Sequence, residues 1–253
     1  MISRICSWSG GKDSTATIIL AHEHGIPIDE IVMAVLWFDK ERGIPAILPS
    51  HWEFITKVAK PKFEEWGYKV TFVDAKYDYI NIFNRIKTKS KYPERNGKKY
   101  GFLLSGFCAM TGEKQNCIKQ IKKRYSDCID FQGIAVDERE RLNHLHKRTN
   151  AISLLEKYNM TEEQAKELCK KYGLLSPLYS SAFTRDGCWF CPNKRIAEKA
   201  YIKQNYPELW EELRKLSLED NLVTDCFSYG KTFAEVDEQV DKYIHRPIQC
   251  SFF

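Results

Sequence analysis

Residues 9–15 constrain the fold of this chain more than any other segment. They read Ser-Gly-Gly-Lys-Asp-Ser-Thr and join an apolar stretch, residues 2–8, to a helical pattern over residues 15–24. The apolar stretch predicts a buried strand. A glycine-rich turn between a strand and a helix directs backbone N–H groups and the positive end of the helix dipole at one point. The segment therefore predicts a phosphate-binding loop.

The residue types of this loop suit phosphate binding. Gly10 and Gly11 allow a ligand to approach the backbone closely, and Lys12 adds a cation. The hydroxyl groups of the two serines and the threonine of the loop can donate hydrogen bonds to phosphate. Asp13 suits either helix capping or Mg²⁺ coordination. The loop is not a Walker A motif, which separates its two glycines by four residues and ends in Lys-Ser or Lys-Thr. The candidate binding residues are Ser9, Gly10, Gly11, Lys12, Asp13, Ser14 and Thr15.

Apolar runs alternate with helical patterns along the first half of the chain. Strands are expected over residues 2–8, 30–38, 68–73 and 130–136, and helices over residues 15–24, 49–66, 77–83 and 117–125. This alternation predicts an α/β fold, a parallel sheet flanked by helices. Residues 1–150 are expected to form the nucleotide-binding α/β domain. Residues 151–253 are expected to form a smaller, mostly helical, cysteine-containing part that packs on the first.

Composition limits the cellular setting. The chain has 253 residues, of which 43% are hydrophobic, and no apolar run approaches the ~20 residues that a membrane-spanning helix requires. Its first residues lead directly into the loop without a signal-peptide pattern, so a cytoplasmic protein without a membrane partner is expected. Nine cysteines are many for a reducing compartment. Metal ligation, redox chemistry or burial should explain them.

The clearest cysteine motif is Cys188-Trp-Phe-Cys191. Two thiolates at this spacing can bind zinc or an iron–sulfur cluster from one tight turn, although the same spacing also occurs in dithiol redox sites and in buried pairs. A metal site needs further ligands, and Cys108 and Cys117 precede the expected fourth strand. The sequence therefore predicts a site built from Cys117, Cys188 and Cys191 with Cys108, without choosing between iron–sulfur and zinc.

Charged residues follow two of the expected strands. Asp137 and Glu138 end the fourth strand, and Arg141 follows them. Open α/β sheets bind ligands at the carboxyl ends of their strands, so these side chains can order bound Mg²⁺ or grip a phosphate or sulfate. Asp39, at the end of the second strand, can contact an adenosine or cap the next loop.

Positive charge gathers in two stretches, residues 87–99 and 114–124, in a chain of net charge +5. Such clusters can contact the phosphates of a nucleic acid or of a nucleotide, or they can form a solvated face. Residues 88–101, which contain Pro93 and two glycines, are expected to form a mobile loop of the kind that serves as a lid.

The loop resembles the S-G-G-K-D-S signature of the PP-loop adenine nucleotide alpha-hydrolase superfamily, which includes ATP pyrophosphatases and phosphoadenosine phosphosulfate (PAPS) reductases. The order of later motifs resembles the PAPS reductase-like family in particular. That family places a cysteine–lysine segment, then G-[IV]-R-x-D-E-S-x-x-R, then P-L-Y before a C-x-x-C. The matching segments here are residues 117–122, 133–141, 177–179 and 187–191.

This resemblance implies a set of roles. Residues 9–14 would hold the phosphate of ATP, adenosine phosphosulfate (APS) or PAPS, and the acidic pair with Arg141 would line the nucleotide pocket. Cys117, Cys188 and Cys191 would correspond to ligands of a [4Fe–4S] cluster. Three departures stand out: Asn116 replaces a family cysteine, Ala135 replaces the motif arginine, and the C-terminal E-C-G-L-H segment is reduced to the surroundings of Cys250.

Three functions follow. The leading expectation is a PAPS reductase-like enzyme with Lys12 and Cys250 as catalytic residues and a thiol reductant as its partner. The second is an ATP pyrophosphatase that adenylates a substrate, such as a nucleic-acid base, for transfer of sulfur from a partner such as a cysteine desulfurase. The third is a nucleotide-sensing module without turnover.

Overall fold

The computed structural model describes residues 2–102 and 108–246. Its centre is a five-stranded sheet in the order β5-β2-β1-β6-β7, and every pairing in it is parallel. The expected α/β fold with a parallel sheet is confirmed. The strands are β1 Ser3–Trp8, β2 Glu30–Val35, β5 Val70–Asp74, β6 Cys128–Phe131 and β7 Ala151–Ile152.

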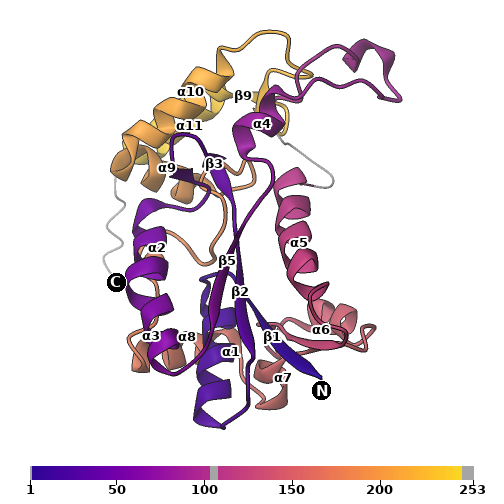
Figure 1. The fold of residues 1–253 in the computed structure, drawn as a ribbon. Helices are drawn as coiled ribbons and strands as arrows, with labels where there is room; N and C mark the ends of the chain where they lie inside the picture. The colour runs from indigo at the N-terminus through magenta and orange to yellow at the C-terminus, as the bar shows by residue number, and fades with distance from the viewer. Residues whose placement is uncertain (1, 103–107, 247–253) are drawn as a thin grey trace. The chain divides into compact units, whose positions relative to one another are not determined.

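Helices cover both faces of this sheet (Figure 1). Ile5 and Val32 pack against Ile121 of α5 (Ala109–Lys122) on one face. Their sequence neighbours Cys6 and Ile31 point to the other face, into the cluster formed with α1 (Lys12–Glu23) and α8 (Glu162–Lys171). Adjacent strand residues point to opposite faces, so two covered faces require the near-continuous apolar sequence of β1 and β2.

The helix expected over residues 49–66 is divided into three pieces. It runs as α2 (Pro49–Phe54), a π-helical turn η1 (Ile55–Ala59) and α3 (Lys60–Glu65). Pro61 lacks the N–H that a continuous α-helix would donate to Lys57, and the π-helical turn precedes that gap. The second apolar run is also divided, because β3 (Trp37–Asp39) leaves the main sheet and pairs with β4 (Ile44–Pro45).

The chain forms two compact units, residues 1–76 with 111–186 and residues 77–110 with 187–253. The first unit contains the parallel sheet. These boundaries differ from the predicted division into residues 1–150 and 151–253, which stays a prediction. The remaining helices of the first unit are α6 (Arg139–Leu145), α7 (Leu154–Lys157) and the 3₁₀ turn η3 (Pro177–Ser180).

The second unit has an aromatic core. Phe102 contacts Phe83 and Phe227 edge to face, and Phe233 continues the row from Phe227. The elements around it are α4 (Tyr79–Asn84), η2 (Pro93–Arg95), α9 (Ile196–Asn205), α10 (Pro207–Ser217), β8 (Cys226–Ser228), β9 (Lys231–Thr232) and α11 (Phe233–Ile244). Among the described residues of both units, no helix has the length and apolar character needed to cross a membrane.

Gly133 brings the end of β6 against the first turn of α1. A Cβ atom at this position would lie 2.5 Å from the carbonyl carbon of Asp13 and closer still to the backbone nitrogen of Ser14. These are backbone atoms, so a side chain here would push two main-chain segments apart.

We expect Gly133→Ala to lower the free energy of unfolding by about 3 kcal/mol or more, because the added methyl group overpacks a backbone contact. The matched control is Gly67→Ala, at a positive φ of 87° with no atom within 4 Å of the new Cβ. Gly67→Ala should lower the free energy of unfolding by about 1 kcal/mol. Urea denaturation of both variants measures the difference, and equal losses would contradict the close approach.

Candidate functional site

The glycine loop lies at the point where the strand order of the sheet reverses. β1 is central, with β2 on one side and β6 on the other, and the loop leads from β1 into α1. Open α/β sheets bind ligands in the crevice beside such a reversal. Gly11 is the N-cap of α1, and no side-chain hydrogen bond caps the helix there. The first amides of α1 therefore have no side-chain cap of the usual kind.

Internal hydrogen bonds fix the shape of the loop. Ser14 Oγ donates to the Gly11 carbonyl at 3.0 Å and accepts from the Ser9 backbone N–H at 3.2 Å. Ser9 Oγ accepts from the Gly11 N–H at 3.3 Å, and Trp8 Nε1 donates to Thr15 Oγ1 at 3.1 Å. The hydroxyls that the sequence offered as phosphate donors thus also hold the loop together.

Gly10 tolerates no side chain. Its φ is +82°, and an added Cβ would overlap the side chain of Ile55. The residue after Ser9 therefore has to be glycine for conformational and steric reasons.

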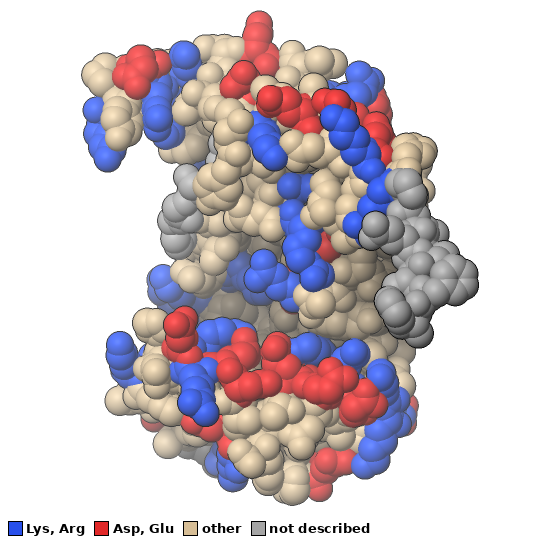
Figure 2. All heavy atoms as spheres, turned by 180° about the vertical axis from the view of Figure 1, so that it is seen from behind, with Lys and Arg blue, Asp and Glu red and all other residues tan. Residues whose placement is uncertain are grey.

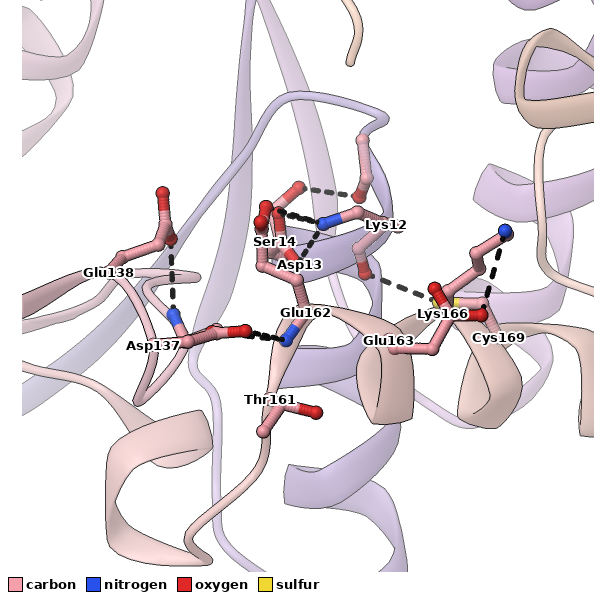
Figure 3. Close-up of polar contacts among 12 residues, drawn as sticks. Lys12, Asp13, Ser14, Asp137, Glu138, Thr161, Glu162, Glu163, Lys166 and Cys169 are labelled. Atoms are coloured by element: carbon pink, nitrogen blue, oxygen red, sulfur yellow. Dashed lines mark hydrogen bonds and ion pairs between the residues drawn. The ribbon is translucent and has the colours of Figure 1, made fainter. Parts of the chain in front are cut away.

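The Lys12 ammonium group is buried between carboxylates (Figure 3). Its Nζ donates to both carboxylate oxygens of Asp13, at 2.8 and 2.9 Å, and to Glu162 Oε1 at 2.8 Å. Burial alone would lower the pKa of Lys12, but the hydrogen bonds and charges of the two acids outweigh it and raise the pKa. Lys12 is a fixed cation at the start of α1.

The two carboxylates that bind Lys12 belong to a cluster of three. Single ligand oxygens of Asp13, Glu138 and Glu162 lie within 4.8 Å of one another, the arrangement of a hard-cation site. Burial, partly offset by Lys12, raises the pKa of Asp13 to about 6, and the other two acids contribute in the same direction. Asp137 helps to position Glu162, because its carboxylate accepts a hydrogen bond from the Glu162 backbone N–H at 3.2 Å.

Two side chains beside the loop were missed by the sequence analysis as site residues. Tyr179, in the Pro-Leu-Tyr segment, accepts a hydrogen bond from the Lys12 backbone N–H at 3.0 Å. Burial and the nearby Asp186 carboxylate raise the pKa of this tyrosine, so its hydroxyl keeps its proton and can donate it. His51 of α2 is the second, and its Nε2 would lie 3.1 Å from a Cβ on Gly10.

Ser176 is the hydrogen-bond partner of the His51 ring. Ser176 Oγ accepts from the Leu178 N–H, and it lies 2.7 Å from His51 Nδ1. If Nδ1 accepts the serine proton, the hydroxyl is fully satisfied, and the imidazole then carries its proton on Nε2. That atom is buried without a hydrogen-bond partner. Burial also lowers the pKa of His51, against the opposing charge of Asp186, which favours the neutral ring.

The other predicted nucleotide-binding residues, Asp39 and Arg141, contact residues of their own segments. Asp39 accepts from the Arg42 backbone N–H at 3.0 Å, the loop-capping alternative that the sequence left open. Arg141 is exposed and pairs with Glu138, whose second oxygen accepts from the Ala135 N–H at 3.1 Å. Arg141 therefore orders a carboxylate of the cluster.

The predicted metal ligands are divided between the two units. Cys117 is buried in the first unit, where burial raises its pKa. Cys188 and Cys191 are half-buried in the second, and Cys108 is exposed. The Cys191 N–H donates to the Cys188 carbonyl at 3.2 Å, which closes the Cys-x-x-Cys turn.

Two further cysteines complete the account. Cys169 packs in the core and donates to the Lys12 carbonyl at 3.2 Å. None of the eight described cysteines forms a disulfide, and Cys250 lies outside the described residues.

Comparison with known proteins gives distant similarities. No protein-family model matches the chain. It is 26% identical over 231 residues to Uncharacterized protein MJ0066 of Methanocaldococcus jannaschii and 21% identical over 224 residues to Uncharacterized protein MJ0973 of the same organism. These matches cover 85% and 81% of the chain but 42% and 45% of the relatives, so the chain spans less than half their length.

Similar solved structures include the U34-tRNA thiolase NcsA from Methanococcus maripaludis with its [4Fe-4S] cluster, at a TM-score of 0.43 and 13% identity. The match covers 99% of this chain and 74% of that one.

The raised pKa of Asp13 predicts a pH-dependent stability. The folded state holds this proton up to about pH 6, whereas an unfolded aspartate releases it near its ordinary pKa of 3.8. The stabilisation that the protonated Asp13 contributes to the folded state is therefore fully present below about pH 4, and it is lost as the pH rises through 6. Relative to wild type, Asp13→Asn should gain about 2 kcal/mol between pH 4 and pH 7.

Urea denaturation at several pH values measures this gain. Glu163→Gln, at an exposed position of α8, is the control and should run parallel to wild type. A constant difference between Asp13→Asn and wild type across this range would contradict the buried, raised-pKa carboxylate.

Proposed function

We propose that this chain is a PP-loop ATP pyrophosphatase that binds magnesium ATP at residues 9–15 and adenylates a second substrate. The observation that carries the proposal is the start of α1 at the strand reversal, where the N-cap Gly11 offers no side-chain cap. Beside it, Lys12 pairs with two members of a cluster of three carboxylates. Backbone amides and Lys12 suit the phosphates, and the carboxylates suit the accompanying divalent cation.

The charge of the site favours a nucleotide that arrives with a metal ion. Lys12 pairs with Asp13 and Glu162, and Arg141 pairs with Glu138. The three carboxylates of the cluster therefore outnumber its two cations. A bare phosphate or sulfate would meet net repulsion there, whereas Mg²⁺ would neutralise it. ATP is handled by enzymes as its magnesium complex. Attack of a thiolate on the sulfur of PAPS has no comparable need for a divalent cation.

The proposed step is a displacement at the α-phosphorus of ATP. An oxygen of the acceptor forms a bond to the α-phosphorus while the bond to the bridging oxygen of the β-phosphate breaks. Pyrophosphate leaves with that electron pair, and the acceptor is left as its adenylate. Lys12 and the loop amides would offset the charge that builds on the phosphate oxygens. Tyr179 and His51 would supply two neutral donors beside the loop.

The sequence had favoured sulfonucleotide reduction, with Cys250 as nucleophile. That residue lies outside the described structure, and the carboxylate cluster favours ATP, so the adenylation alternative is the better supported of the two. Replacement of the activated oxygen by sulfur would follow as a separate step that needs a sulfide or persulfide donor. A cysteine desulfurase is the class of partner that provides one.

A metal centre is a second element of the proposal. The closed turn of Cys188 and Cys191 fits two thiolate ligands of zinc or an iron–sulfur cluster. Lys199 steadies this turn, because its buried Nζ donates to the Pro192 carbonyl at 2.9 Å. Cys117 and Cys108 remain the proposed further ligands. Bound metal would add thiophilic or redox chemistry, and the cysteines would supply its thiolate donors.

Nucleotide titrations test the proposed function directly. With Mg²⁺ present, ATP should bind at least about ten-fold more tightly than APS or PAPS, and chelation of Mg²⁺ should weaken ATP binding by a similar factor. Lys12→Ala should weaken ATP binding about 10- to 100-fold, because it removes a charge-assisted hydrogen bond. Calorimetry measures all of these affinities. Tighter binding of PAPS without Mg²⁺ would favour reduction instead.

Lys166→Ala is the control for this titration. It removes a lysine of α8 that pairs with Glu163 at 3.7 Å and should bind ATP like wild type.

His51→Phe keeps a buried ring but loses the Nε2 donor, so ATP affinity should fall about five-fold while adenosine affinity stays constant. Equal losses for ATP and adenosine would assign His51 a structural role only.

Metal analysis of anaerobically purified protein tests the cysteine proposal. Wild type should carry near-stoichiometric iron or zinc, and Cys188→Ser with Cys191→Ser should remove it. Cys226→Ser is the matched control, since Cys226 is also a half-buried cysteine of the second unit. Wild type with neither metal would overturn the site.

A further inference from the structure

Residues 85–100 form an ordered excursion from the second unit, termed here the basic arm (Figure 1, following α4). Its two sides pair with each other, since the Lys87 N–H donates to the Lys98 carbonyl and the Tyr100 N–H to the Arg85 carbonyl, both at 2.9 Å. The 3₁₀ turn η2 forms its tip. The Lys99 N–H also donates to the Asn221 carbonyl at 2.8 Å. The segment expected as a mobile loop is therefore a tethered hairpin-like structure.

The arm concentrates the positive charge of the protein. It contains seven lysines and arginines and one acid, Glu94, a net charge of +6 in a chain whose total is +5. The rest of the sequence is thus close to neutral. Figure 2 shows the arm at its upper left, with basic side chains around a small acidic patch. Its cations are Arg85, Lys87, Lys89, Lys91, Arg95, Lys98 and Lys99.

Most of these cations have no acidic partner among the described residues. Lys99 pairs with Glu219 at 2.7 Å, and Arg95 lies 4.0 Å from Glu94. The other five form no ion pair with any described residue. Lys57, Lys215 and Lys242, by contrast, each pair with a glutamate three or four residues away. They provide paired lysines with which the cations of the arm can be compared.

An aromatic ring stands among these charges. Tyr92 is 42% exposed, with the Arg95 guanidinium 4.4 Å and the Lys91 ammonium 4.9 Å from its ring centre. Unpaired bases stack on such rings, and cations beside the ring hold the neighbouring phosphates.

We propose that the basic arm binds single-stranded nucleic acid, with its lysines on the phosphates and an unpaired base on Tyr92. This inference names the acceptor class of the proposed adenylation and in that respect rests on it. The binding itself needs no ATP, so the two proposals can fail separately. RNA and DNA share the backbone chemistry recognised here, and the experiment distinguishes them.

The test measures binding of fluorescent 20-nucleotide strands, RNA and DNA of one sequence, by anisotropy between 50 and 200 mM KCl without nucleotide. We expect the triple variant Lys87→Gln, Lys89→Gln, Lys91→Gln to lose about 10- to 100-fold in affinity at 100 mM salt. The slope of log affinity against log salt should shrink by about 2, because three phosphate contacts are lost. Tighter wild-type binding of RNA or of DNA identifies the natural strand.

The matched control removes the same charge from paired lysines. Lys57→Gln, Lys215→Gln, Lys242→Gln should retain wild-type affinity and slope within about two-fold. An equal loss in both triple variants would reduce the effect to net charge and overturn the arm as the binding site. Unchanged binding in the arm variant would overturn it as well.

Tyr92 separates base stacking from charge. Tyr92→Ala should weaken binding of the single strand about 5- to 100-fold and leave binding of the matching duplex unchanged, and Tyr92→Phe should restore it. Displacement of bound strands is compared with polyglutamate as the competing polyanion. Binding of polyglutamate in preference to either strand would overturn the proposal in favour of an acidic protein.

Affinity for magnesium ATP is measured in the same variants and should not change. Strand binding that depends on the arm, in a protein that fails to bind ATP, would refute the proposed function and leave the arm intact. ATP binding in a protein whose arm variant binds strands normally would do the reverse.

Discussion

The backbone contact between the exit of β6 and the first turn of α1 is the constraint on which the site depends. Gly133 has no side chain, so β6 can approach Asp13 and Ser14 at main-chain distance. This contact brings the segment after β6, with Glu138, beside the loop after β1. A parallel sheet places both strand ends at one edge, and the missing Cβ lets the carboxylates of Asp13 and Glu138 come within 4.8 Å of each other. The fold and the site are thus determined by the same atoms.

The charged groups of the site stabilise one another, whereas each of them alone would be costly to bury. Lys12 is buried and would be costly alone, and the same holds for Asp13, whose pKa stays raised to about 6 even beside the lysine. Glu162 completes the balance from α8, a helix that begins 150 positions after Lys12. A protein optimised only for stability would place apolar residues here. The retained charges are better explained by a charged ligand that the cluster accommodates.

Sequence patterns predicted the parts of this structure that are local. The apolar run of β1 and the turn at Gly10 each carry their signal within a few residues, and both are present. β7 has two residues and no periodicity to detect. The roles of Glu162 and His51 could not be predicted, because each meets the loop only through tertiary packing.

The distribution of charge links the two proposals. A net charge of +5 reads as mildly basic, yet the arm alone carries +6 and the rest of the chain is almost neutral. Some helix lysines of the remainder have glutamate partners one turn away, and Lys12 has its own carboxylates. Charges that pair internally serve the fold. Five of the seven cations of the arm form no ion pair with a described residue, and an exposed cluster of like charges repels itself unless something outside the chain neutralises it. A polyanion does so along its whole length, whereas a nucleotide would neutralise only a few of these groups.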